Sequence, residues 1–216
     1  MNLPETWRLV RLSAICEINP PLFRDEKPSL DTFVSFVPMA AVDEVEGKIT
    51  RPETRALREV SKGFTAFREN DVLFAKITPS MENGKAAIAT GLQNGLGFGS
   101  TEFHVLRPTE HLLPDYLFYF IRQPWFRERA SAAFVGSAGQ QRVPQDFLER
   151  VLLPVPPLTE QQRIVAILRQ TDDLRRLRRE ALETTQYLTK TLFIEIFGDP
   201  ATNPKGWPIA QFGKFG

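Results

Sequence analysis

The sequence predicts an α+β fold, in which a globular domain is followed by one long α-helix that can form a coiled coil. Two contrasting textures support this prediction. Residues 1–157 contain short apolar runs separated by Gly and Pro, as strands and turns require, whereas residues 159–197 contain neither Gly nor Pro. Glycine, proline and aromatic residues then return. We therefore divide the chain into residues 1–157, 158–197 and 198–216.

The first region is expected to mix strands with short helices. Residues 101–108 alternate polar and apolar side chains, the period of a strand with one buried face. Pro114 favours the first turn of a helix that we expect to continue to about residue 131. A second short helix is expected near Pro144, after a glycine-containing loop at 135–142. Apolar runs bounded by turn residues predict further strands at 33–38, 71–77, 86–89 and 151–156.

The second region is expected to form one continuous helix. Thr159 is a good N-cap, and Gln162 three residues later completes a capping box. At about 1.5 Å per residue this helix is too long to pack against one domain along its whole length, so we expect it to project and pair with another helix. Apolar or small residues recur every three or four positions, and the expected pairing seam includes Ile164, Ile167, Leu174, Ala181, Leu188 and Leu192.

The third region resembles the start of the first. Residues 4–12 and 204–212 share a frame in which Pro is followed by Trp, an aliphatic residue and a large apolar residue at matching positions. A second copy of the first domain would begin in this way. The match is short, and chance is the alternative explanation. The tail alone is too short to fold, so we expect it to be disordered or docked as an edge piece.

Composition limits the possible function classes. Of the 216 residues, 42% are hydrophobic and 25% are charged, as in a globular protein with a core. Cys16 is the one cysteine, so no internal disulfide forms, and neither His104 nor His111 has a clear set of metal-ligand partners. We therefore expect no metal and no cofactor. The net charge of +1 gives no evidence for a nucleic-acid partner.

Nothing in the sequence indicates export or membrane insertion. The N-terminus carries charges without the long apolar run of a secretory signal. No stretch reaches the ~18 apolar residues of a membrane span. Since no disulfide framework is present either, we expect a cytoplasmic protein.

Motifs for an enzyme that acts on nucleic acid are incomplete. Residues 19–21, Asn-Pro-Pro, resemble the signature of amino-methyltransferases, but Leu22 stands in the aromatic position and no glycine-rich loop for a methyl donor lies nearby. Nuclease chemistry needs clustered carboxylates, yet Ala75 stands where an acid should accompany Asp71 and Lys76. A Ser–His–Asp triad stays open, although its Gly-x-Ser-x-Gly turn is absent. We expect no catalytic residues.

Two polar loops remain as candidates for binding. One covers residues 76–85 and the other covers residues 136–142. Lys, Ser and Thr commonly contact DNA phosphates, whereas Gln, Asn and Arg recognise base edges. Polarity alone is weak evidence, since surface loops are generally polar. The candidate DNA-binding residues are Lys76, Thr78, Ser80, Asn83, Lys85, Ser137, Gln140, Gln141 and Arg142.

Residues 153–165 resemble a junction found in the specificity subunits of type I restriction–modification systems. In that family a target recognition domain ends in a Pro-Pro-Leu-x-Glu-Gln stretch, and a long conserved helix begins. The Gly-Ser-Thr-Glu-Phe sequence within residues 99–108 resembles the family's core strand, and Trp7 and residues 136–138 also fit. The similarity covers essentially all of residues 1–197.

The resemblance implies a non-catalytic subunit that recognises double-stranded DNA. Such subunits carry two recognition domains joined by antiparallel helices, and each domain recognises one half of a bipartite site. They dock two methyltransferase subunits and, in the full complex, motor–nuclease subunits. This chain carries one recognition domain, so it resembles half of such a subunit. We therefore expect a homodimer that pairs its helices in antiparallel fashion over a palindromic split site.

Two alternative functions remain open at this point. One is a freestanding enzyme that modifies nucleic acid. The other is a coiled-coil adaptor that binds only protein, which predicts affinity for a methyltransferase subunit without salt-dependent DNA binding.

Overall fold

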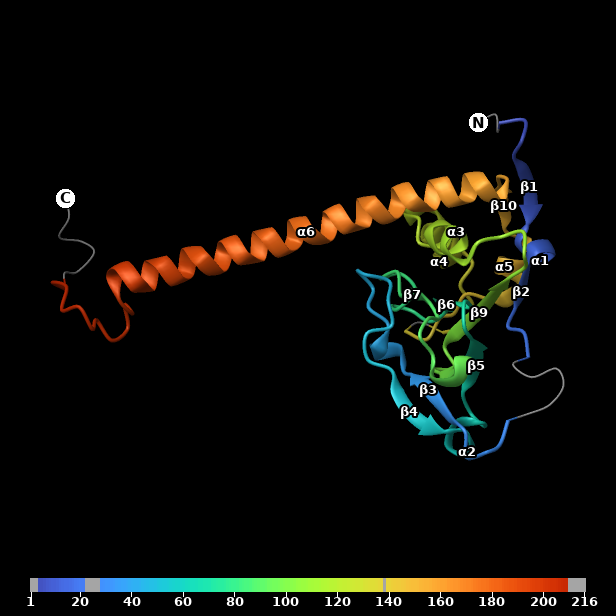
Figure 1. The fold of residues 1–216 in the computed structure, drawn as a ribbon, viewed down its shortest axis with the longest axis horizontal. Helices are drawn as coiled ribbons and strands as arrows, with labels where there is room; N and C mark the ends of the chain where they lie inside the picture. Colours follow the sequence, from blue (N-terminus) through green and yellow to red (C-terminus); the bar gives the residue numbers. More distant parts are fainter. Residues whose placement is uncertain (1–3, 22–27, 138, 210–216) are drawn as a thin grey trace. The chain divides into compact units, whose positions relative to one another are not determined.

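The computed structural model describes residues 4–21, 28–137 and 139–209. The chain divides into a head that ends at Ala166 and a second unit that begins at Ile167. Helix α6 (Leu158–Phe197) begins in the head and continues into the second unit. The predicted α+β class with one long helix is confirmed. The other elements, traced in Figure 1, are β1 (Arg8–Arg11), α1 (Leu12–Ile15), β2 (Cys16–Ile18), β3 (Phe33–Val37), η1 (Met39–Ala41), β4 (Glu53–Ala56), α2 (Leu57–Val60), β5 (Thr65–Arg68), β6 (Val72–Ala75), β7 (Ala86–Ile88), η2 (Gln93–Gly95), β8 (Leu96–Gly99), β9 (Phe103–Pro108), α3 (Pro114–Ile121), α4 (Pro124–Ala132), α5 (Gln145–Arg150) and β10 (Leu152–Val155).

Three sheets form within the described part of the head. β1 pairs with β10, a second sheet has the strand order β2-β9-β6-β7, and a third has the order β4-β3-β8-β5. The second sheet is antiparallel throughout, whereas β3 and β8 are parallel. In the second sheet, Ala75 of β6 pairs with Phe103 of β9. The loop after β6 therefore begins beside the segment that leads into β9.

The β2-β9-β6-β7 sheet is covered on both faces. Alternate residues of a strand point to opposite faces, so Val72 and Phe74 enter a core shared with helices α3, α4 and α5. Leu73 enters a different core, which also contains Val37 from β3 and Phe67 from β5. Figure 1 shows the corresponding order, with α3 and α4 on one side of the sheet and β3 and β4 on the other. The head is thus a layered structure with this sheet at its centre.

Strand β9 differs from the half-buried strand predicted at 101–108. All residues from Phe103 to Arg107 are buried, and the polar ones have partners. Arg107 bonds both carboxylate oxygens of Asp71, at 2.8 and 2.7 Å, and His104 bonds the carbonyl of Val143 at 2.8 Å. Buried polar groups require such partners. The alternation in the sequence therefore marks satisfied polar residues inside the head and not a solvent-facing side.

The single helix predicted from Pro114 to about residue 131 is two helices. α3 ends at Ile121, and α4 begins at Pro124 after an extended Gln123 (φ −60°, ψ 138°). Proline has no backbone N–H and disfavours a helical conformation in the residue before it, so the helix breaks there. Strands do occur in the predicted intervals 33–38, 71–77, 86–89 and 151–156, and a short helix follows Pro144 as predicted.

The long helix is confirmed, but its predicted cap is wrong. α6 begins at Leu158, so Thr159 lies inside the first turn. The carbonyl of Pro157 accepts the backbone N–H groups of Glu160 at 2.9 Å and of Gln161 at 3.0 Å. Pro157 therefore occupies the N-cap position, and its carbonyl accepts the first hydrogen bonds of the helix.

Side chains in the first turn of α6 fasten it to the rest of the head. Glu160 accepts a hydrogen bond from the indole N–H of Trp7 at 3.1 Å. Gln161 is completely buried. These contacts give a physical role to the Glu-Gln pair that ends the junction motif. The side-chain amide of Gln161 bonds, each at 2.9 Å, the carbonyls of His111 and Pro156 and the N–H of Leu113.

Residues 198–209 close the end of α6 in the second unit. Gly198 has φ +79°, the left-handed conformation that commonly ends a helix. The indole N–H of Trp207 donates to the carbonyl of Phe197 at 2.8 Å, which satisfies a helix-end acceptor. Residues 198–209 form no strand, and the expected resemblance of this tail to the start of a second recognition domain stays a prediction. The last part of the proposed repeat, residues 210–212, lies outside the described residues.

Candidate functional site

The two polar loops identified in the sequence are joined to each other. We call residues 76–85 the first loop and residues 136–142 the second loop. The backbone N–H of Thr78 donates to the carbonyl of Gln141 at 3.0 Å. An antiparallel bridge also connects the two segments. Two loops that are far apart in the sequence thus form one continuous surface.

The first loop is a compact turn with a buried anchor. Met81 is completely buried in the core that the helices cover. Around it, the N–H of Lys85 donates to the carbonyl of Ser80 at 3.0 Å, and the N–H of Asn83 donates to that of Pro79 at 2.9 Å. The anchor and these bonds fix the backbone, while the side chain of Asn83 stays exposed.

Two candidate DNA-binding side chains of the first loop have intramolecular partners. The ammonium of Lys85, whose side chain is 18% exposed, donates to the carbonyl of Val42 at 3.1 Å and lies 3.7 Å from the carboxylate of Glu44. The hydroxyl of Thr78 donates to the carboxylate of Glu82. Both side chains therefore stabilise the loop itself.

The second loop is a short hairpin that glycine makes possible. Val135 and Arg142 exchange backbone hydrogen bonds of 3.0 and 2.9 Å at its base. Gly136 (φ +110°) and Gly139 (φ +82°) take conformations that residues with a Cβ rarely adopt. Ala138, between them, lies outside the described residues. The loop is held at its base and carries polar side chains at its tip.

The base of the second loop is held by an ion pair that the sequence analysis did not assign. Arg142 donates through Nε and Nη2 to the two carboxylate oxygens of Glu102, at 2.9 and 2.8 Å. These hydrogen bonds lower the pKa of Glu102. Glu102 belongs to the Gly-Ser-Thr-Glu-Phe motif, and an acidic residue directly before a buried strand is the signal that could have revealed it.

His104 holds Val143, the residue that follows Arg142. Its Nε2 lies 2.8 Å from the carbonyl of Val143, which can only accept, so Nε2 carries the proton. Nδ1 then accepts a hydrogen bond from the side-chain amide of Asn19 at 3.0 Å. Burial is the largest cause of the lowered pKa of His104. A neutral ring with both nitrogens engaged is a structural histidine.

Asn19, the first residue of the Asn-Pro-Pro motif, is likewise structural. Its Oδ1 accepts the N–H of Val105 at 2.9 Å, and its Nδ2 donates to Gln145 at 2.8 Å as well as to His104. Its φ of 53° is a conformation that asparagine tolerates better than most residues. The amide is used by these bonds and is not presented to a target base, so the motif favours a turn over an amino-methyltransferase site.

Asp71, considered above as a nuclease acid, is not available to a metal ion. It is 1% exposed and both of its oxygens bond Arg107. No group of three or more His, Cys, Asp or Glu residues that could hold a metal occurs within residues 4–21, 28–137 and 139–209. Burial raises the pKa of the Cys16 thiol to about 12, which keeps it protonated and unreactive at neutral pH.

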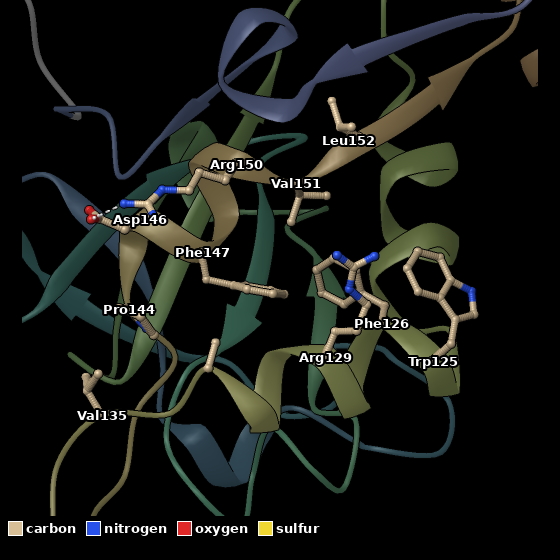
Figure 2. Close-up of a pocket in the computed structure, with 11 residues that line it drawn as sticks. Trp125, Phe126, Arg129, Val135, Pro144, Asp146, Phe147, Arg150, Val151 and Leu152 are labelled. Atoms are coloured by element: carbon tan, nitrogen blue, oxygen red, sulfur yellow. Dashed lines mark hydrogen bonds and ion pairs between the residues drawn. The ribbon is translucent and has the colours of Figure 1, made fainter.

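A pocket of ≈ 530 Å³ opens beside the second loop (Figure 2). Val135 and Pro144, which flank the loop, form part of its wall. Asp146 in the lining is ion-paired with Arg150 at 3.2 Å. The pocket lies between the stems of the loop and two helices, and its lining combines apolar side chains with the charged Arg129, Asp146 and Arg150. Its aromatic lining consists of Trp125 and Phe126 from α4 and Phe147 from α5.

A second candidate surface lies along α6 in the second unit. Ile164 differs from the other predicted seam residues because it belongs to the head and packs against its core. Ala181 is exposed. Despite this apolar content, none of the helices within the described residues is both long and apolar enough to cross a membrane. The large seam residues beyond the head are exposed by 55% at Ile167, 67% at Leu174, 52% at Leu188 and 52% at Leu192.

Comparisons with known proteins give the same result in sequence and in structure. The sequence model of the type I restriction modification DNA specificity domain matches residues 4–184. The specificity subunits of the type I restriction enzymes EcoAI and EcoEI, both from Escherichia coli, are each 38% identical to this chain, over 197 and 196 residues and 88% of its length. The chain spans about a third of the length of each, 33% and 32%.

Two solved structures resemble the fold. A chain from a structure of a type I R-M system, described for its complex assembly and conformational transition, matches with a TM-score of 0.70 and 29% identity, over 97% of this chain and 53% of that chain. The crystal structure of the HsdS subunit from Thermoanaerobacter tengcongensis matches with a TM-score of 0.65 and 29% identity, over 97% of this chain and 52% of that chain.

Proposed function

Because this chain belongs to the family of type I restriction–modification DNA specificity domains, we propose that it recognises a specific sequence in double-stranded DNA. It does so as a non-catalytic recognition subunit, and the surface made by the two loops faces the DNA. The observation that carries this proposal is the pairing of the loops, which gathers hydrogen-bonding side chains from distant parts of the chain on one surface.

The candidate residues divide into those that contact DNA and those that hold the loops. Thr78, Lys85 and Arg142 have intramolecular partners and keep the loops in place. Lys76 contributes positive charge toward phosphate. Amides and hydroxyls distinguish bases through their donor and acceptor pattern. Within the described residues, five candidates make no side-chain hydrogen bond and supply the base contacts, namely Ser80, Asn83, Ser137, Gln140 and Gln141.

The test is recognition of a selected duplex by this chain assembled with a methyltransferase subunit. A duplex is first selected from a random pool, and affinities are then measured for it and for each single base-pair substitution. Each lost base contact costs about 1–3 kcal/mol. We therefore expect Asn83→Ala and Gln140→Ala each to weaken binding to the selected duplex roughly tenfold and to relax specificity at one position.

Gln93→Ala is the matched control, because Gln93 is also an exposed glutamine but lies outside both loops. It should leave affinity and specificity unchanged. Equal binding of the unaltered protein to all duplexes would contradict sequence recognition. A specificity profile that none of the loop substitutions alters would contradict the assignment of the surface.

For the second unit we propose that α6 pairs with α6 of a second copy in antiparallel fashion. The large apolar side chains repeated along residues 167–192 support this proposal, since their exposure in water is unfavourable. A two-fold pair would place two heads over a split palindromic site, with the paired helices setting the spacing of its halves.

Sedimentation over a wide concentration range tests the pairing. We expect a dimer for the unaltered chain and a monomer for Leu174→Asp, because a buried carboxylate without a partner is costly. A monomer at every concentration would contradict the proposal. A dimer that binds a methyltransferase subunit but shows no salt-dependent DNA binding would instead support the adaptor alternative.

The partners that fit this function are methyltransferase subunits and, in a restricting complex, motor–nuclease subunits. The names of the relatives as restriction-enzyme specificity subunits support this assignment. Catalysis and its cofactors then reside in those partners, and the site of action is the cytoplasm, where the DNA lies. Methylome sequencing of cells that express this chain with a methyltransferase partner tests the complete proposal, since one modified motif should depend on this chain.

A further inference from the structure

Two side chains hold the base of the second loop, one directly before strand β9 and one within it. Glu102 directly precedes β9 and His104 is its second residue. These two side chains hold consecutive residues of the segment that follows the loop tip. Glu102 binds the guanidinium of Arg142, and His104 binds the carbonyl of Val143. We call these two side chains the β9 clamp.

The clamp also connects the two loops. The N–H of Val143 donates to the carbonyl of Lys76 at 2.8 Å, and the N–H of Lys76 donates to the carbonyl of Glu102 at 2.9 Å. Lys76 is the first residue of the first loop. Movement of the second loop along β9 would therefore break contacts to the first loop as well, and the relative setting of the two loops depends on the clamp.

The tip of the second loop is tied to its base by Arg142, whose Nη1 donates to the carbonyl of Gln140 at 2.8 Å. Within the tip, the N–H of Gln140 donates to the carbonyl of Ser137 at 3.0 Å, and an added Cβ at Gly139 would meet nothing within 4 Å. The side chains of Ser137 and Gln140 are exposed. Glu102 binds the same guanidinium that holds Gln140. The clamp at the base therefore sets where the tip side chains lie.

We propose that Glu102 and His104 are positioning residues for DNA recognition, which fix the second loop relative to the first without touching DNA. This inference rests on the proposed function of the loops. It predicts that the clamp controls discrimination between DNA sequences more than it controls overall affinity. Non-specific affinity comes mainly from contacts to phosphates, and the clamp supplies none.

The main test uses Glu102→Gln in the full chain with its methyltransferase subunit. The affinity ratio between the selected duplex and its single-substitution variants should fall on the order of tenfold, the value of one well-made base contact. The slope of affinity against salt should stay as in the unaltered protein, because the number of phosphate contacts is unchanged. The exchanged pair Glu102→Arg with Arg142→Glu should recover part of the lost ratio.

Substitutions of His104 provide an independent test of the clamp. Glutamine can place an N–H donor where the Nε2 of His104 lies, so His104→Gln should keep most of the discrimination, whereas His104→Ala should lose it. Asp146→Asn is the control, since it removes another carboxylate–arginine pair of the head, with Arg150, that is not part of the clamp. Its discrimination ratio should not change.

Amide hydrogen exchange of residues 135–143 separates this inference from the proposed function. In Glu102→Gln, exchange should accelerate in this segment while the amides of β6 and β9 remain protected as in the unaltered protein. If the unaltered complex does not discriminate between duplexes, the proposed function is wrong. Amide hydrogen exchange alone then tests whether Glu102 and His104 hold the second loop. Unchanged exchange and an unchanged ratio in both Glu102→Gln and His104→Ala would overturn it. A general loss of protection in both variants would also overturn it, because the two residues would then stabilise the whole head.

Discussion

The head buries polar side chains, whereas the second unit exposes apolar ones. In the head, charged and polar residues such as Asp71, Arg107 and His104 are buried and each has a partner within the same chain. Along α6 beyond residue 167, large apolar side chains are about half exposed. The difference supports the proposal that α6 pairs with a second copy, whereas the head buries its core within one chain. Changes in the head should therefore act at any protein concentration, and changes along the α6 seam should depend on it.

The largest effect is expected where the head buries charge. Asp71→Ala leaves the guanidinium of Arg107 buried without its carboxylate, and breaking such a pair costs about 3–5 kcal/mol of the free energy of unfolding. Denaturant unfolding measures this loss, which should not vary with protein concentration. In the control Arg58→Ala, which breaks an exposed pair with Asp31, the loss should stay below about 1 kcal/mol. Similar losses in both variants would refute the distinction between the two pairs.

Substitutions in the α6 seam should change the dissociation constant of the proposed dimer. Leu188→Ala removes one leucine side chain from each copy of the proposed helix pair. At roughly 1.5 kcal/mol for each leucine, the dimer should weaken by about 3 kcal/mol, or about a hundredfold in its dissociation constant. Sedimentation equilibrium measures this change. Gln186→Ala, off the seam, should leave the constant unaltered, and equal weakening by both variants would mean that the seam is wrongly placed.

A smaller effect is expected where α6 joins the head. Gln161→Leu removes the amide that bonds three backbone groups, of His111, Leu113 and Pro156. Buried groups left without partners cost about 1–3 kcal/mol. The free energy of unfolding of the head should fall by this amount without a change in self-association. A variant that changes only the dimer constant would show that Gln161 serves the second unit instead.

The sequence predicted the features that depend on neighbouring residues. Uninterrupted helical spacing without Gly or Pro predicted α6, and apolar runs between turn residues predicted β3, β6, β7 and β10. The break before Pro124 was also a local signal, which the prediction of one helix overlooked. The cap at Thr159 was misplaced because the helix begins at Leu158, and the carbonyl of Pro157 accepts its first hydrogen bonds.

Features that depend on distant residues could not be predicted in this way. The burial of β9 requires Asp71 and Val143 as partners for Arg107 and His104, and no spacing within 101–108 reveals them. The same limit applies to the loops. Their polarity was visible in the sequence, but their pairing depends on tertiary contacts. So does the engagement of Lys85 by the carbonyl of Val42.

The smallest expected effect is a pH dependence in the head that the second unit should lack. The folded pKa of His104 is lowered, chiefly by burial, so the unfolded chain takes up a proton first, near its ordinary pKa of about 6.5. Stability should therefore be unaffected above this pH, fall as the pH drops from about 6.5 toward the folded pKa, and level off below it. Protonation would also set an Nδ1–H against the amide N–H of Asn19, which explains why the charged ring is disfavoured.

Denaturant midpoints of the unaltered chain and of His104→Gln between pH 7.5 and 5.5 measure this contribution. The midpoint of the unaltered chain should decline more steeply with acid, because glutamine does not titrate. The pKa of Glu102 is lowered by Arg142, so its stabilising effect is lost only at more acidic pH, as its carboxylate is protonated below about 4.5. It does not contribute in this window. Parallel curves for the two proteins would show that His104 is protonated as readily in the folded head as in the unfolded chain, and that its two hydrogen bonds do not require the neutral ring.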